Sequence, residues 1–373
     1  MYALVAKLAS ICTILTLAAW QDLELHQVDI KGIYLNGELM DNECIYMCQL
    51  PGYGDLTHLK RVHHLCKMLY SLKQSGRWWY QKLIQILVIK LHFKQCTINQ
   101  AVFVKHGPTT LVIIVVYIND YTIMASSLAL VIAFKVELSK HVEIMDLGEL
   151  CWLLSIEVTH NQEECSLTLS QWLYLDSIIF CFNFDKLKPV SLPIEQNVRL
   201  STSQSPSTGT DYAAMQHVPY QEAVRLLMYA ALGTWPNISY AVTNVLHFSS
   251  NPDTPQWDTI HLIYYYLLRM KDLHLTYGGV EKALVSYIDT DWSMDKDHKA
   301  ISGYTFLING DTVLWSSKKQ EIMSLSTTES KYVTMTHTTK EALWLHSLIT
   351  KVFHPLKVLS HFSLTSNQPL CSW

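Results

Sequence analysis

The feature that most constrains the fold is an apolar run that a polar pair interrupts. Leu111–Tyr117 is apolar and rich in β-branched residues, and it is far too short to span a bilayer. Asn119 and Asp120 break this run before it resumes at Thr122. The pattern predicts a buried strand followed by a β-hairpin that carries polar residues at its tip.

Further strands and a helix are predicted around this hairpin. Leu25–Leu35 alternates in polarity and carries Asp29, which predicts a strand with an acid near its end. Leu69–Leu91 has apolar residues at helical spacing, and Ala101–Lys105 predicts a strand before the tight pair Gly107–Pro108. The first half of the chain is therefore expected to contain a sheet with at least one helix.

Met1–Trp20 permits two interpretations. Its small and apolar residues resemble a signal peptide, but Lys7 is the only basic residue and no small-x-small cleavage site follows it. Apolar residues recur at helical spacing from Leu8 to Ala18. We favour a buried helix, and we expect neither a secreted nor a membrane protein.

The second half changes in composition and pattern. Ser201–Thr210 is rich in Ser, Thr, Gly, Gln and Pro, which is typical of a linker. Helical spacing follows, and then three apolar strands precede a long helix; Asn309–Gly310 predicts a hairpin turn between the last two strands. The expected helices are 220–232, 238–247, 257–270 and 328–353, and the expected strands are 285–287, 303–308 and 312–316.

Composition bounds the class of protein. The length of 373 residues is enough for two or three domains. Hydrophobic residues make up 49% and charged residues 16%, which predicts a folded globular protein. The 28 basic residues face 32 acidic ones, a balance that opposes strong nucleic-acid binding unless the basic residues cluster. The nine cysteines form no C-x-x-C pair, so reduced thiols and a cytoplasmic or nuclear location are expected. We interpret His63, His64 and Cys66 as loop residues rather than as metal ligands.

Ten sequence blocks, in order along nearly the whole chain, resemble copia-type retrotransposon polyproteins. The block that begins at His26 reads HQVDIKGIYLNGEL and resembles the family's HQxDVKxAFLNGxL. Tyr117-Ile-Asn-Asp120 stands at the position of the family's YVDD box. The blocks are 26–39, 45–53, 69–80, 117–120, 145–149, 227–242, 287–292, 302–304, 315–320 and 341–345.

The resemblance implies an α+β fold, with reverse-transcriptase palm and fingers, a helical thumb and connection, and a ribonuclease H-like α/β domain truncated at its carboxyl end. It implies RNA-directed DNA synthesis and removal of RNA from the hybrid, with an RNA template, a DNA primer and an RNA–DNA hybrid as partners, and no membrane. The implied domains are fingers and palm at 1–160, a thumb-like segment at 161–200, linker and connection at 201–280, and ribonuclease H at 281–373.

The resemblance also assigns roles to single residues. Asp29 and Asp120 match two acids that hold Mg²⁺ in the polymerase, and Asp289 matches the first metal-binding acid of the ribonuclease H. Tyr34 matches the aromatic residue under the incoming sugar, and substrate-binding roles follow for Tyr117 and Lys31.

Several positions depart from the family's pattern. Asn119 stands where the first acid of the YVDD box belongs, and it lacks the charge that a magnesium ion prefers. Lys331 replaces the second glutamate of the family's SSTEAEY block, and Ser366 replaces an aspartate. Glu329 remains two positions away, on a different side of a helix. The family match ends before a last helix and its acid.

These losses predict an impaired or inactive polymerase and ribonuclease H. Three interpretations remain open at this point: a decayed, inactive copy, a residually active reverse transcriptase, and a non-catalytic nucleic-acid-binding remnant. A primer-extension assay with Mg²⁺ or Mn²⁺ separates the first two.

Overall fold

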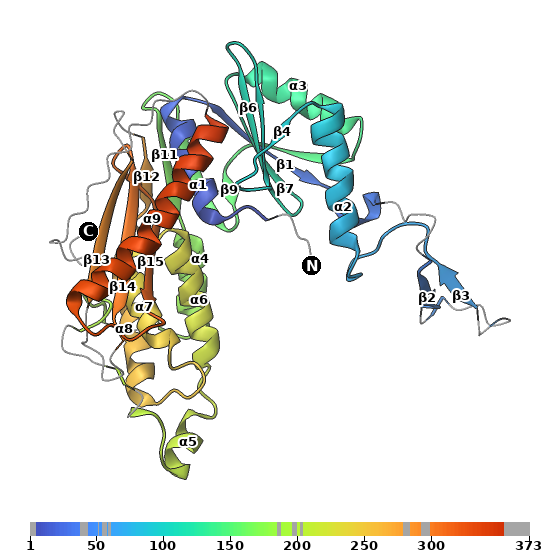
Figure 1. Ribbon diagram of the computed structural model, residues 1–373. Coiled ribbons are helices and arrows are strands. Elements are labelled where there is room, and N and C mark those ends of the chain that lie inside the picture. Colours follow the sequence, from blue (N-terminus) through green and yellow to red (C-terminus); the bar gives the residue numbers. More distant parts are fainter. Residues whose placement is uncertain are drawn as a thin grey trace. The chain divides into compact units, whose positions relative to one another are not determined.

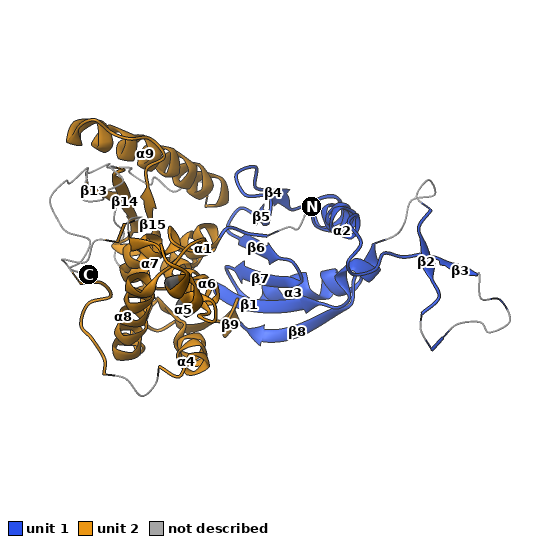
Figure 2. Cartoon of the chain, turned by 90° about the horizontal axis from the view of Figure 1, so that it is seen from below, with its two compact units in different colours: residues 1–7, 23–150 blue, residues 8–22, 151–373 orange. Residues whose placement is uncertain are grey.

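The chain forms two compact units (Figures 1 and 2). Unit 1 comprises Met1–Lys7 and Leu23–Leu150, and unit 2 comprises Leu8–Asp22 and Cys151–Trp373. The structure is a computed structural model. It describes residues 5–37, 44–50, 52–53, 58, 61–184, 188–195, 200–201, 204–278, 284–291 and 299–353.

Unit 1 is built on a six-stranded antiparallel sheet with the strand order β4-β5-β6-β7-β1-β8. The central strands β6, β7 and β1 are almost wholly buried; β6 is a continuous apolar run, whereas β1 also buries the polar side chains of His26 and Gln27. The strands are β1 (Glu24–Ile30), β4 (Lys94–Gln95), β5 (Val102–His106), β6 (Leu111–Tyr117), β7 (Asp120–Ala125) and β8 (Ile144–Glu149).

Two helices cover one face of this sheet. Helix α2 (Ser75–Ile84) continues into a π-helix (Gln85–Lys90), and α3 (Leu128–Ser139) follows β7. Their apolar side chains share one core with those of β1, β6 and β7 that point to the same face. The members of this core from the two helices are Trp79, Leu83, Ile86, Leu87, Val131, Phe134 and Leu138.

The predicted β6–β7 hairpin is confirmed. A two-residue turn, Ile118–Asn119, joins the strands, and Tyr117 lies opposite Asp120. Ile118 has a positive φ of 58°, which is rare for a β-branched residue because its side chain crowds the backbone. Such backbone strain persists only where the surrounding structure fixes it, and it is found often at functional sites.

Two predicted elements of unit 1 are shorter than expected. The strand predicted over Leu25–Leu35 ends at Ile30, because Gly32 adopts left-handed φ and ψ of 57° and 44° and starts a 3-10 helix (Ile33–Asn36). The helix predicted over Leu69–Leu91 begins only at Ser75, since Ser71 has a φ of 71°, which no right-handed helix contains. Periodicity alone does not reveal such local turns.

Unit 2 contains the helix predicted near the amino terminus and a four-stranded antiparallel sheet. Helix α1 (Leu8–Trp20) is buried at every residue from Ser10 to Ala19, so it is a core helix on all sides. It contacts strands of both sheets of the unit and helix α9. The four-stranded sheet has the order β12-β11-β10-β9, with β9 at Trp152–Leu153, β10 at Ile156–Asn161, β11 at Ser166–Ser170 and β12 at Leu275–Tyr277.

A helical cluster forms the second core of unit 2. The three helices predicted between residues 220 and 270 are confirmed, and they pack with α4 around Trp235 and Tyr264. Asp253 and Gln256 cap the start of α8 reciprocally, as a capping box requires. The helices are α4 (Trp172–Cys181), α5 (Gly209–Met215), α6 (Tyr220–Gly233), α7 (Ser239–Leu246) and α8 (Thr254–Met270).

The last described part of the chain is a three-stranded sheet and a long helix, as predicted. Strands β13 (Val285–Asp291), β14 (Ile301–Ile308) and β15 (Asp311–Lys319) pair antiparallel, and α9 (Thr327–Val352) packs on β13 and β14. Asn309 and Gly310 both have positive φ, which is the geometry of a type I′ hairpin turn.

Hydropathy of the helices bears on the membrane question. Within the residues that the structure describes, no helix combines the length and the apolar character needed to cross a bilayer.

The core of unit 1 gives a direct test of the fold. Replacing the fully buried Leu83 by alanine should lower the stability of unit 1 by about 2–5 kcal/mol, because the change leaves a cavity. The control Ile89→Ala alters a residue that is 64% exposed and should change stability by less than about 0.5 kcal/mol. Hydrogen exchange of the β6 and β7 amides, followed by mass spectrometry, measures this unit alone. Equal effects of the two variants would contradict the packing.

Candidate functional site

The sheet of unit 1 brings two acids of distant sequence together. Asp29 on β1 lies directly opposite Asp120 on β7 in the antiparallel register. The N–H of Ile30 donates to the carbonyl of Asn119 at 3.0 Å and continues the ladder into the hairpin turn. Residues in such opposed positions have Cβ atoms about 4.5–5.5 Å apart, so the two carboxylates are close neighbours.

The side chains of this pair project from the face of the sheet that α2 and α3 do not cover. Val28 and Ile30 on β1, and Tyr121 on β7, point into the core beneath the two helices. Asp29 and Asp120 lie at the alternate positions, so they point to the other face. Both are partly exposed.

Asn119 occupies the space between the hairpin turn and Asp29. Its side-chain amide donates a hydrogen bond to Oδ1 of Asp29. An aspartate at position 119 would place a third negative charge here, whereas asparagine supplies a donor. The amide thus satisfies one carboxylate oxygen that would otherwise be available to a cation.

Burial and mutual repulsion both disfavour the charged form of Asp120 in this acid pair. Burial raises the pKa of Asp120 above its ordinary value, and the neighbouring charge of Asp29 raises it further. A divalent cation would offset this repulsion.

The remaining predicted substrate residues lie at the ends of the same strands. Tyr34 lies on the 3-10 helix after β1 and packs edge-on against the ring of Tyr70, with ring centroids 5.1 Å apart. Tyr117 ends β6 opposite Asp120. The ammonium of Lys31 pairs with Glu143 at 2.7 Å, and this hydrogen bond raises the pKa of the lysine.

A second polar cluster lies on the covered face of β1. Nζ of Lys135, a buried side chain on α3, is 2.5 Å from Oδ1 of Asp146 on β8 and 3.1 Å from Nδ1 of His26 on β1. Burial alone would raise the pKa of Asp146, but the hydrogen bonds from Lys135 and from the Gly148 N–H outweigh it and lower the pKa. This cluster joins α3 to β1 and β8.

Sequence reasoning did not identify Lys135. The signal was present as a single lysine within the otherwise apolar stretch Leu128–Val136, where a solvated charge is not expected. A buried lysine needs an acceptor, and Asp146 lies only eleven residues away.

The residues present do not fit a two-metal centre. Such centres hold two cations about 3.5–4 Å apart and need several convergent carboxylates. Asp29 and Asp120 supply two, and the Asn119 amide donates into one of them. In the part of the chain that the structure describes, no three His, Cys, Asp or Glu side chains converge to hold a metal ion.

Asp289, the acid predicted in the second half, lies on β13 of unit 2 opposite Gly303. Its Oδ1 accepts a hydrogen bond from the Thr290 N–H at 2.8 Å. On the alternate face of the strand, the Thr290 hydroxyl contacts the hydroxyl of Thr334 on α9 at 2.8 Å. The buried contacts between β13 and α9 at this point are therefore hydroxyl groups.

The start of α9 carries the other two residues of interest. Glu329 belongs to the helix cap, because its carboxylate accepts from the Leu325 N–H at 2.7 Å and its own N–H donates to Ser326 Oγ. Lys331 is exposed. Ser366, the remaining substituted position, lies outside the described residues.

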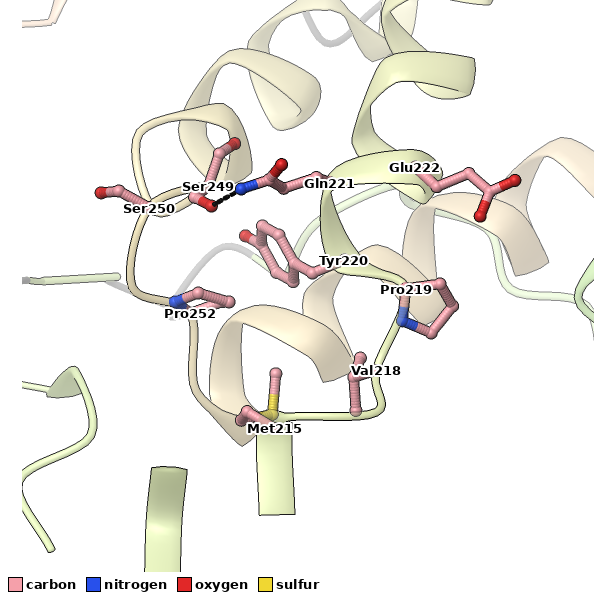
Figure 3. Close-up of a pocket in the computed structure, with 9 residues that line it drawn as sticks. All are labelled: Met215, Val218, Pro219, Tyr220, Gln221, Glu222, Ser249, Ser250 and Pro252. Carbon is pink, nitrogen blue, oxygen red and sulfur yellow. Dashed lines mark hydrogen bonds between the residues drawn. The ribbon is translucent and has the colours of Figure 1, made fainter. Parts of the chain in front are cut away.

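A pocket in unit 2 lies apart from these predicted residues. It forms where α6 begins, against the segment that follows α7, and the Gln221 side chain bonds the Ser249 carbonyl across it at 2.9 Å (Figure 3). None of the site residues predicted from the sequence lines this pocket.

Comparison with known proteins supports the resemblance found in the sequence. Residues 1–196 match the family described as reverse transcriptase (RNA-dependent DNA polymerase). The chain is 35% identical over 91% of its length to the retrovirus-related Pol polyprotein from transposon TNT 1-94 of Nicotiana tabacum, and 30% identical over 93% to that from transposon RE1 of Arabidopsis thaliana.

The chain spans 26% and 23% of the length of these two relatives, about a quarter. It is also 26% identical over 84% of its length to a putative transposon Ty5-1 protein of Saccharomyces cerevisiae, which it covers completely. The chain therefore belongs to the reverse transcriptase (RNA-dependent DNA polymerase) family and derives from a copia-type retrotransposon polyprotein.

Proposed function

We propose that this chain is a reverse transcriptase and ribonuclease H fragment whose polymerase centre is impaired. The observation that carries the proposal is the hydrogen bond from Asn119 to Asp29. Phosphoryl transfer depends on convergent carboxylates, because the cations that they hold stabilise the charge of the transition state. At this centre a neutral amide takes one acidic position and also engages an oxygen of the next acid.

The assignment of domains rests on the same family resemblance, and its first boundary differs from that of the compact units, because Leu8–Asp22 and the chain from Cys151 onward belong to unit 2. We assign palm and fingers to residues 1–160, a thumb-like segment to 161–200, linker and connection to 201–280, and a ribonuclease H-like domain to 281–373. The antiparallel sheet with its acidic hairpin suits a palm, and three antiparallel strands followed by a long helix suit a ribonuclease H-like domain. The substrates would be an RNA template, a DNA primer and their hybrid.

Magnesium enters the proposal only as the ion that the family uses. The two carboxylates and one donating amide do not fit a pair of magnesium ions, so no reaction step is assigned to the ion. The same centre would still position an incoming nucleotide if Tyr34 and the neighbouring aromatic Tyr70 contact it.

Primer extension tests the proposal. The unmodified chain should extend a primed RNA template little or not at all in Mg²⁺ or Mn²⁺. Asn119→Asp should raise extension, by roughly 10-fold or more, because it restores a charged ligand and removes the donor that engages Asp29. Robust Mg²⁺-dependent extension by the unmodified chain would contradict the proposal.

Asn161→Asp is the matched control for this assay. It introduces the same charge at an exposed residue of β10, in the other unit, and leaves an acceptor for the Glu164 N–H that Asn161 already binds. It should not raise extension. Asp29→Asn added to Asn119→Asp should abolish any activity that the first change restores.

The raised pKa of Asp120 predicts how stability depends on pH. A raised folded-state pKa means that the folded chain binds the proton more tightly than the unfolded chain does, so the associated stability is present at low pH and is lost as pH rises through the folded pKa. Asp120→Asn should therefore raise the thermal unfolding midpoint near neutral pH. It should change the midpoint little at about pH 3, where Asp120 is protonated in both states.

Glu149→Gln is the control for this measurement, because it removes one charge from an exposed position on the same sheet. At neutral pH, Glu149→Gln should change the thermal unfolding midpoint less than Asp120→Asn does. A neutral-pH midpoint that falls in Asp120→Asn would contradict the raised pKa of Asp120.

The ribonuclease H-like part gives a separate prediction. The purified chain should not cleave the RNA strand of an RNA–DNA hybrid, since Glu329 caps α9 and Lys331 puts a positive charge at a family acid position. Lys331→Glu alone should not restore cleavage, because Ser366 leaves a second position without a carboxylate. Cleavage that Asp289→Asn abolishes, and that the exposed control Asp272→Asn leaves intact, would contradict this.

A further inference from the structure

The hairpin β2–β3 of unit 1 carries three exposed cysteines. Strands β2 (Tyr46–Cys48) and β3 (Val62–His64) extend away from the six-stranded sheet in both views (Figures 1 and 2). Cys48 lies on β2, while Cys44 precedes this strand and Cys66 follows β3. Their exposure makes all three thiols accessible to reagents in solution.

The register of the hairpin brings one pair of these cysteines opposite each other. Tyr46 pairs with His64 and Cys48 pairs with Val62. Beyond the named strands, the Leu65 N–H donates to the Ile45 carbonyl at 3.0 Å, which continues the antiparallel register by one pair. The next pair in this register is Cys44 with Cys66.

The cross-strand position of Cys44 and Cys66 also suits a disulfide bond. Opposed residues alternate between hydrogen-bonded pairs and non-hydrogen-bonded pairs, and the latter have Cα atoms only about 4.5 Å apart. Because Ile45 and Leu65 share a hydrogen bond, the pairs on either side of them are of the close type. Tyr46 and His64 form one of these, and their ring centroids are 5.2 Å apart. Cys44 and Cys66 stand at the other such position, for which the continued register predicts a separation at the short end of the range that disulfides span.

We propose that Cys44 and Cys66 form a reversible disulfide across this hairpin in the presence of a disulfide oxidant such as glutathione disulfide. The thiolate of one cysteine attacks a sulfur of the oxidant, breaks its S–S bond and releases one glutathione. The thiolate of the other cysteine then attacks the resulting mixed disulfide and releases the second glutathione. The protein loses two protons and two electrons, which the two glutathione thiols carry away.

Three other cysteines, Cys48, Cys12 and Cys96, lack this arrangement. Cys48 faces Val62 across the hairpin, so it has no thiol opposite it. Cys12 and Cys96 are buried, and burial raises the pKa of the Cys12 thiol to about 11, which suppresses its reactive thiolate. The inference is independent of the proposed function, because it needs no metal and no nucleic acid.

Peptide mapping of the intact chain tests the disulfide. After incubation of the native protein with glutathione disulfide, trypsin should release peptide 32–60 joined to peptide 62–67 under non-reducing conditions, two hydrogen atoms lighter than the sum of the two. Dithiothreitol should separate them. The oxidised protein should migrate as a monomer on a non-reducing gel, because the link lies within one chain.

Two variants identify the sulfur atoms, since peptide 32–60 contains both Cys44 and Cys48. Cys48→Ser should form the linked peptides as the unmodified chain does, and Cys44→Ser should not. A link that survives in Cys44→Ser and disappears in Cys48→Ser would overturn the proposal. So would separate peptides that carry glutathione on each cysteine, because a close pair expels the second glutathione.

Discussion

The pairing of β1 with β7 determines the candidate site. Both strands are buried between other strands of the sheet, and Asp29 falls opposite Asp120 in their register. Because side chains alternate along a strand, a slip of either strand by one residue would turn its carboxylate beneath α2 and α3, away from the other acid. The apolar residues that alternate with the acids, Val28 and Tyr121 among them, therefore fix the acids on the uncovered face. Lys135 on α3 joins β1, through His26, to β8, through Asp146.

The register creates an electrostatic cost that asparagine partly relieves. Two neighbouring carboxylates repel each other, and this repulsion adds to the effect of burial in raising the pKa of Asp120. Cations compensate such clusters in enzymes that transfer phosphoryl groups. Here the amide of Asn119 provides a hydrogen-bond donor instead. Under the proposed function, asparagine in place of aspartate at position 119 makes this turn easier to fold without a metal ion. The same asparagine makes the turn a poorer ligand for a metal ion.

The sequence predicted those elements whose cause is local. The interruption at Asn119–Asp120, the Asn309–Gly310 turn and the helical spacing from Leu8 to Ala18 each act through neighbouring residues, and all three predictions are confirmed. The ends of elements were missed where one backbone angle decides them, as at Gly32 and Ser71. The contact of Lys135 with His26 joins residues 109 positions apart, and the donor role of Asn119 toward Asp29 joins residues 90 apart. Such contacts depend on the register of strands, which periodicity does not specify. The family resemblance supplied the identity of the acids, whereas only the structure revealed the hydrogen bond from Asn119 to Asp29.

In both units, the buried core is independent of the polar residues at the positions of the family's sites. The stability of each unit is the sum of many buried contacts, so no single polar position on the surface decides it. Asparagine has nearly the shape of aspartate, and at position 119 it gains a hydrogen bond. Lys331 lies on the exposed side of α9, while Ser330, Thr334 and Ala342 on its buried side keep the contact with the sheet. Catalysis by metal ions has no such tolerance, since each carboxylate contributes separately to the charge that holds the ions. Substitutions of this kind therefore leave the core intact and act first on the charge of the site.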